Sequence, residues 1–215
     1  EGSIECEGLQ PLKLSTMIAS GSGPAPAPMQ IAAWWADKFN RLFQNQQEEP
    51  RVKRVEAVLE MRPQKLETAI ESAWLDRSEA LPGEEITGRI ALRQWRGDRV
   101  TREFRFRVPA NLPRGEYRIL LSNADVLNRP QAMAGMVNRQ MNLAQTASLL
   151  AQERRNDRIY LSLVTNKPTV YVEDQALRDV PPSVLAAMQN PRAPARALAT
   201  PETVLPLGEL ELDSL

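Results

Sequence analysis

Histidine is absent from the 215 residues of this chain, and cysteine occurs once, at Cys6. Without an imidazole the chain cannot assemble a Ser-His-Asp or Cys-His catalytic arrangement, and the usual zinc sites are excluded as well. A single cysteine excludes an intrachain disulfide and a multi-cysteine metal site. We therefore assign no catalytic, cofactor-binding or metal-binding residue from the sequence.

Long hydrophobic runs and net charge are also lacking. No stretch approaches the roughly 20 apolar residues that a membrane helix requires, so we expect no transmembrane segment. The 27 Lys and Arg cancel the 27 Asp and Glu, and the overall charge therefore gives no attraction toward nucleic acid or an anionic membrane. The sequence starts at Glu1 without a Met or an apolar leader, which is typical of a processed protein or an excised fragment.

The clearest pattern present is residues 82–121, which predict three strands and their turns. Ile86, Gly88, Ile90 and Leu92 alternate with polar side chains, as expected of a half-buried strand. The next run repeats the pattern, with Phe104, Phe106 and Val108 pointing inward and Glu103, Arg105 and Arg107 outward. Arg96-Gly97-Asp98 falls at the tip between them, where a tight turn explains this integrin-type tripeptide better than recognition does.

Other elements are expected on both sides of this region. Before it, we expect extended segments within 4–19, a Pro/Gly linker over 20–28, an aromatic helix over 29–46, and strands over 51–61 and 65–76. After it, we expect one helix over 134–155, a strand over 158–165 paired with 170–172, a short helix from Pro182, a loop over 190–201 and a closing strand over 205–212.

Together these elements predict a mainly β protein, an antiparallel β-sandwich of immunoglobulin or fibronectin type III-like architecture with a few added helices. The predicted organisation has three parts. Residues 1–50 hold the N-terminal extended segment, linker and amphipathic aromatic helix. Residues 51–128 form the sandwich core, and residues 129–215 add a helix and strands that complete the sandwich or pack on it.

Arginine is concentrated in residues 89–118, which carry nine arginines against three acidic residues, an excess of six. The arginines could simply be the solvated face of a sheet, where charge discourages edge-to-edge pairing. They could also form an anion-binding or partner-binding face, because a guanidinium matches carboxylate and phosphate groups. Nucleic acid is a poorer match because Trp95 is the main aromatic available for stacking. The candidate residues are Arg89, Arg93, Arg102, Arg105 and Arg107.

Four short motifs occur together in the sequence: Leu81-Pro82-Gly83-Glu84, Leu92-Arg93-x-x-Arg96-Gly97, Asp125-x-Leu127-Asn128-Arg129, and Asn156-Asp157-Arg158-Ile159-Tyr160. This combination, over residues 50–190, resembles the C-terminal accessory region of bacterial, acidobacterial-type envelope proteins of the SpoIVB-type serine peptidase class. In that family a histidine serves a catalytic serine in an upstream domain. Neither the Gly-x-Ser-Gly-Ser-Pro type motif that holds the family's serine nor any histidine is present here, so the resemblance transfers no catalytic residue.

We therefore expect a non-catalytic accessory or interaction module of a secreted or envelope bacterial protein. The alternative is a part of a SpoIVB-type peptidase whose catalytic domain lies outside this chain. The expected partners are another protein or that upstream domain, or an anionic polymer such as cell-wall material.

Overall fold

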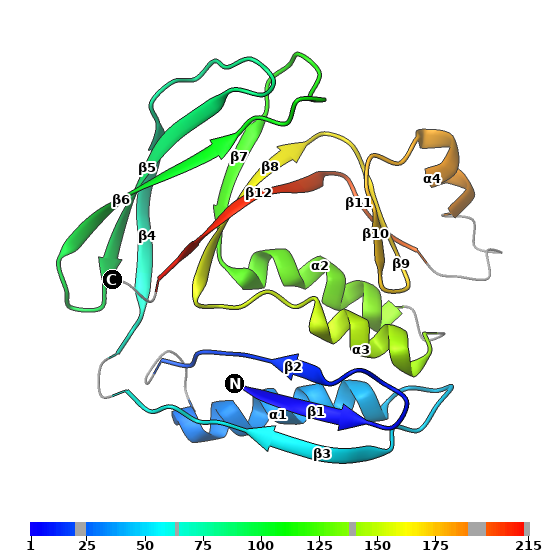
Figure 1. Cartoon of the computed structure of the whole chain (residues 1–215). Helices are drawn as coiled ribbons and strands as arrows, with labels where there is room; N and C mark the ends of the chain where they lie inside the picture. The colour runs from blue at the N-terminus through cyan, green and yellow to red at the C-terminus, as the bar shows by residue number, and fades with distance from the viewer. Residues whose placement is uncertain (20–24, 63–64, 138–140, 189–196, 213–215) are drawn as a thin grey trace. The chain divides into compact units, whose positions relative to one another are not determined.

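Strands dominate the computed structural model of the chain. The structure describes residues 1–19, 25–62, 65–137, 141–188 and 197–212. At residues 136 and 137 it describes the backbone alone. The described residues form four three-stranded antiparallel sheets and four helices (Figure 1). The prediction of a mainly β chain with a few helices is confirmed. The chain divides into two units, each assembled from three separate segments. The first contains 1–61, 123–156 and 165–203, and the second contains 62–122, 157–164 and 204–215.

In the first unit, an aromatic helix packs on a small sheet of order β2-β1-β3. The strands are β1 (Gly2–Cys6), β2 (Leu12–Leu14) and β3 (Val52–Ala57), and the helix is α1 (Ala27–Phe43). Alternation places Ile4, Cys6, Leu12 and Leu14 on one face of the sheet, where they are buried. Trp34, Trp35 and Phe39 of α1 pack against these residues, so the aromatic stripe serves as core.

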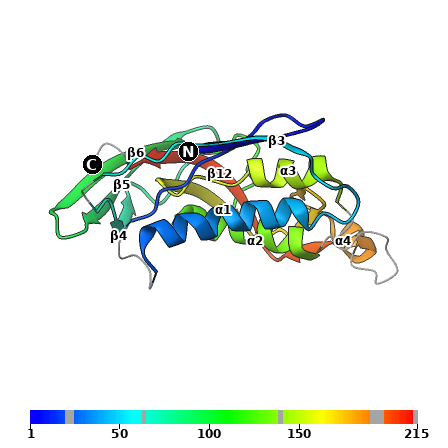
Figure 2. The same cartoon turned by 90° about the horizontal axis from the view of Figure 1, so that it is seen from below.

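The same unit contains two further helices, α2 (Ala124–Val137) and α3 (Leu143–Ala151). The views in Figures 1 and 2 agree that α3 runs beside α1, and Leu143 and Leu150 of α3 join the core of the small sheet. A second sheet of order β10-β9-β11 completes the unit, with strands β9 (Thr169–Val172), β10 (Gln175–Leu177) and β11 (Leu198–Thr200) and the short helix α4 (Pro182–Met188).

The second unit consists of two sheets that share two hydrophobic clusters. One sheet has the order β4-β5-β6, from β4 (Thr68–Leu75), β5 (Glu85–Gln94) and β6 (Arg99–Arg107). The other has the order β12-β8-β7, from β7 (Arg118–Ser122), β8 (Arg158–Thr165) and β12 (Thr203–Glu211). Ile90 and Leu92 of β5 pack with Ile159 of β8, and Phe106 of β6 packs with Leu161, so the inward sides of both sheets form one core.

Most predicted strands are confirmed, and so are the aromatic helix and the helix from Pro182. The single helix over 134–155 is wrong: α2 ends at Val137 and α3 begins at Leu143, after Met141 and Asn142 outside any helix. The strand over 51–61 ends at Ala57. Strand β9 pairs with β10 and β11 instead of β8.

The loop over 190–201 contains β11, and its residues before 197 lie outside the described residues, as do 20–24 of the predicted linker. Among the described residues, the helices lack the combination of length and hydropathy that crossing a bilayer requires.

Candidate functional site

An arginine-rich surface covers the side of the β4-β5-β6 sheet that faces away from the core. Strand register places Arg89 and Arg93 of β5 on this side, together with Arg99, Arg105 and Arg107 of β6. All five are exposed, because they alternate with Ile90, Leu92, Phe106 and other residues that point inward. We call these five residues the arginine face.

Arg102 does not belong to this surface. It lies opposite the buried Ile90 in the ladder and therefore has the orientation of the inward-pointing side chains. The sequence could have predicted this orientation, because residues two apart on a strand point to the same face and Arg102 is two residues from the inward-pointing Phe104. Arg99 takes its place, because it lies directly opposite Arg93. Of the five predicted residues, four thus share one face.

Three carboxylates partly neutralise the arginine face. Glu71, at a bulge in β4, bridges Arg93 and Arg99, the latter at 3.2 Å. Glu103 accepts two hydrogen bonds from Arg105, at 2.8 and 3.0 Å, and this contact raises the pKa of the Arg105 guanidinium. Glu85 lies opposite Arg107. Five arginines against three glutamates leave an excess of two positive charges on this side of the sheet.

Arg89 and Arg107 lie opposite Glu103 and Glu85 in the ladder but form no ion pair with these residues, and Glu103 pairs with Arg105 instead. In the part of the chain that the structure describes, neither guanidinium has an ion-pair partner within 4 Å, although both are exposed. They are therefore available to a ligand without breaking an existing pair. This distinguishes them from Arg93, Arg99 and Arg105.

Two exposed tryptophans belong to the same sheet and its turn, the predicted Trp95 and, in addition, Trp74. Trp74 of β4 lies directly opposite Arg89 and is 42% exposed. Trp95, in the β5–β6 turn, is 51% exposed, and the Lys65 ammonium lies 3.5 Å from the centroid of its ring. Trp74 is thus an exposed aromatic ring whose place in the ladder is directly beside Arg89.

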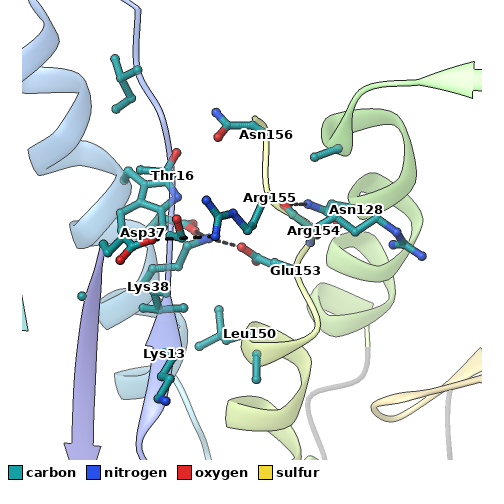
Figure 3. A pocket seen from close by; sticks show the side chains of 18 of the residues that line it. Lys13, Thr16, Asp37, Lys38, Asn128, Leu150, Glu153, Arg154, Arg155 and Asn156 are labelled. Atoms are coloured by element: carbon teal, nitrogen blue, oxygen red, sulfur yellow. Dashed lines mark hydrogen bonds and ion pairs between the residues drawn. The ribbon is translucent and has the colours of Figure 1, made fainter. Parts of the chain in front are cut away.

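The first unit contains a separate feature, an open cavity of about 990 Å³ lined by α1, by the segment after α3 and by the chain after β2 (Figure 3). Its polar lining includes Lys13, Thr16, Asp37 and Asn156, and Leu150 supplies part of an apolar wall. Charges of both signs line it, and the most buried of them are paired.

Lys38 is the most buried charge in the cavity, with its side chain 5% exposed. Its ammonium lies 2.5 Å from Glu153 and 3.2 Å from Asp37, and 5.4 Å from the centre of the Trp34 ring. Glu153 also accepts a hydrogen bond from Arg41. Two cations and two carboxylates therefore neutralise one another, and the cluster joins α1 to the segment after α3.

Two asparagine side chains near this cavity each form a pair of hydrogen bonds with the backbone amide and carbonyl of one residue in another segment. Asn128 of α2 donates to the carbonyl of Arg154 (3.1 Å) and accepts from its amide (2.9 Å). Asn156 donates to the carbonyl of Met17 (2.7 Å) and accepts from its amide (2.8 Å). Both asparagines come from the motifs that suggested a peptidase relative, and here they hold segments together.

The described residues contain no cluster of three His, Cys, Asp or Glu side chains that could hold a metal ion. Cys6 is buried in the core of the small sheet, and burial raises the pKa of its thiol, which disfavours the nucleophilic thiolate. The arrangement can bind charged groups, and the arginine face is where charge remains unpaired. Compared with known proteins, the chain matches no family model, no curated protein and no solved structure.

Proposed function

We propose that this chain is a non-catalytic interaction module that binds an anionic polymer through the arginine face. The observation that carries the proposal is that two exposed arginines, Arg89 and Arg107, form no ion pair with any described residue, among five arginines on one side of the β4-β5-β6 sheet. A guanidinium without a partner keeps both donor edges for an incoming carboxylate, sulfate or phosphate.

The spacing on the sheet suits a chain of repeated anionic groups. Alternate residues on one strand lie roughly 7 Å apart and neighbouring strands about 4.8 Å apart, so the arginines form a grid on these intervals. A polymer with one anionic group for every one or two sugar units could contact several arginines at once. Such contacts add to each other even where each one is weak.

An anionic polysaccharide fits this surface better than nucleic acid. Single-stranded nucleic acid binding uses several aromatic platforms for successive bases, and the arginine face offers Trp74 alone beside Arg89. One exposed indole next to a guanidinium suffices to stack a sugar ring while the cation holds its acidic group. Cell-wall material of this chemistry is the ligand class that we favour.

A location in the bacterial envelope, or secretion, belongs to the same proposal. So does membership of the accessory region of SpoIVB-type peptidases, which rests on the four sequence motifs. For the second unit we propose the immunoglobulin or fibronectin type III-like class of β-sandwich, since its two antiparallel sheets share one core. In each case the functional expectation is binding, because the chain has no histidine.

Binding of fluorescent heparin and of polyphosphate, measured by anisotropy at increasing salt, tests the proposal. The purified chain should bind at least one of them, and affinity should fall with salt as screening increases. The variant Arg89→Glu/Arg107→Glu should lose binding by at least about tenfold, because it replaces two free cations with two anions. Arg96→Glu/Arg114→Glu, two charge reversals outside the strands of the same unit, is the matched control and should bind almost as the wild type does.

Two results would overturn the proposal. One is the absence of salt-sensitive binding to either polymer, and the other is equal loss of binding in the control variant. Incubation with a serine-directed phosphonate probe addresses the alternative. Labelling of a serine in this chain would show catalytic chemistry and contradict a binding role without catalysis.

A further inference from the structure

Strand β3 forms an open edge of the small sheet in the first unit. The arginine face belongs to the second unit. Strand β3 pairs with β1 on one side and ends the order β2-β1-β3. Residues 53–57 are all exposed, Val55 at 45%. The apolar side chains that follow are exposed too, with Leu59 at 63% and Met61 at 93%. An exposed edge of this kind is a template for another strand.

The hydrogen-bond pattern shows which backbone groups point outward. Glu1 and Val58 exchange both backbone hydrogen bonds, at 3.0 and 2.8 Å, and in an antiparallel ladder bonded and non-bonded pairs alternate. Ser3 and Glu56 are therefore a bonded pair, and Ile4 opposite Val55 and Gly2 opposite Ala57 are non-bonded pairs. It follows that the amides and carbonyls of Val55 and Ala57 point away from β1. In the described part of the sheet no strand lies on that side.

We infer that β3 pairs with β3 of a second copy of this chain, antiparallel and with the two-fold axis at Val55. In this register Val55 faces Val55 of the second copy, and their outward amides and carbonyls bond each other. Arg54 then lies opposite Glu56 of the second copy, and Glu56 opposite its Arg54. Both charge pairs are satisfied at once because the sequence Arg-Val-Glu is self-complementary about its centre.

Charge favours a second copy over an unrelated strand. Arg54 and Glu56 already lie on one face of β3, where they form an ion pair within the strand. A partner with two positive or two negative charges at these positions would place like charges opposite each other, which destabilises a ladder. A second copy always presents the opposite charge at each position. The register does not extend to Val52, because the bulge at Lys53 turns this side chain toward the core of its own unit.

Lys53 limits how far this ladder extends. Two residues of β1, Glu5 and Cys6, face Arg54 and Val52, so Lys53 is the extra residue of a β-bulge. Bulges and lysines are the features by which edge strands avoid indiscriminate pairing. In the proposed register Lys53 faces Ala57 of the second copy and meets no second cation. Its ammonium also lies 3.8 Å from Glu7 of its own chain. The edge therefore admits a short ladder of one register.

A charge-reversal series measured by sedimentation equilibrium tests the inference. The full chain should form a dimer at micromolar to submillimolar concentration. Arg54→Glu should weaken association roughly tenfold or more, since it places two glutamates opposite each other at two symmetric positions, and Glu56→Arg should do the same with arginines. The double variant Arg54→Glu/Glu56→Arg restores opposite charges in every pair and should recover dimerisation.

A backbone variant tests the same ladder without changing charge. Val55→Pro removes an amide that points outward and makes no bond to β1, so it should abolish dimerisation while the unit keeps its thermal transition. Val55→Thr keeps the amide and a β-branched side chain, and should dimerise as the wild type does.

A wild-type chain that stays monomeric throughout this concentration range would overturn the inference. So would single charge reversals or Val55→Pro that associate as strongly as the wild type. Polymer binding by the arginine face does not enter these measurements, so the two proposals succeed or fail separately.

Discussion

At the scale of single residues, Glu153 joins the two cations of the charged cluster in the first unit. It accepts a hydrogen bond from Arg41 and lies 2.5 Å from the nearly buried ammonium of Lys38. Glu153→Gln would leave Lys38 with the half-exposed Asp37 as its remaining carboxylate, and the loss of one partner of a buried charge should destabilise the fold by roughly 1–3 kcal/mol. Chemical denaturation with intrinsic fluorescence measures this loss. The exposed Glu48→Gln is the control and should stay within about 0.5 kcal/mol of the wild type.

A second substitution shows how much of the destabilisation by Glu153→Gln comes from the buried charge of Lys38. Lys38→Met in the Glu153→Gln background removes the ammonium that has lost its closer carboxylate and keeps the apolar part of the side chain. The double variant should therefore be more stable than Glu153→Gln alone. A Glu153→Gln protein as stable as the wild type would show that the cluster contributes nothing to folding.

Two further residues of the first unit predict how stability depends on pH. Burial raises the pKa of the Cys6 thiol and of the Tyr171 phenol above their ordinary values. The folded state then keeps both protons at pH values where the unfolded state releases them. The contribution of these two groups to the free energy of unfolding is complete below the pKa values that they have in the unfolded chain. It is lost as the pH rises above about 9.

Thermal melts between pH 7 and pH 11 check this dependence. The melting temperature should fall at alkaline pH, and Cys6→Ala/Tyr171→Phe, which removes both ionisable groups, should reduce the slope. Titration of Cys6 with a thiol reagent gives a second readout, since the native thiol should react slowly and the denatured thiol rapidly. Fast labelling of the native protein would contradict the buried position of Cys6.

At the scale of elements, the boundary between α2 and α3 depends on a capping box. The Asn142 side chain accepts from the amide of Gln145 at 2.8 Å, and the Gln145 side chain accepts from the amide of Asn142 at 2.9 Å. Asn142→Ala removes the first bond and should cost about 1 kcal/mol, whereas Asn142→Asp keeps an acceptor and should cost much less. Urea denaturation of the three proteins measures the difference, and equal stability of the Ala and Asp variants would disprove the cap.

This cap also explains why the sequence predicted one helix where there are two. Met141, Ala144, Ala147 and Leu150 fall at helical spacing, and that pattern continues through the boundary at Asn142. The Asn-x-x-Gln signature is the local signal that could have located it. Strands were predicted well because the two-residue alternation is local and survives in β5 and β6 without knowledge of their neighbours.

Strand pairing is a different matter, because it depends on residues far apart. The sequence placed 170–172 beside 158–165, which are neighbours along the chain, yet β9 pairs with β10 and with β11, whose residues 198–200 come much later. The arginine face contains features of both kinds, some that local alternation predicts and some that depend on strand pairing. Its four correctly grouped members follow from parity alone, but Glu71 of β4 and the position of Trp74 opposite Arg89 follow from register between strands.

At the scale of the whole molecule, the chain passes between its two units five times, after residues 61, 122, 156, 164 and 203. Neither unit is therefore a continuous piece of sequence. In the second unit, β4 to β7 come from 62–122, while β8 and most of β12 come from segments that begin at 157 and 204. Composition and local pattern give no sign of such interleaving, because each segment looks complete by itself.

Interleaving makes a direct prediction about the segment 51–128. As an isolated fragment it contains β4 to β7 but lacks β8 and β12, and with them the buried Ile159 and Leu161 and the partly buried Leu207 and Leu210. Each fully buried side chain contributes roughly 1.5–3 kcal/mol, and a domain has only about 5–15 kcal/mol of net stability. We expect the fragment to be unfolded, with poorly dispersed amide resonances and no cooperative melting, whereas the full chain gives both. A fragment with dispersed resonances and a cooperative transition would show that residues 51–128 hold a complete core, and that the strands from the later segments only cover it.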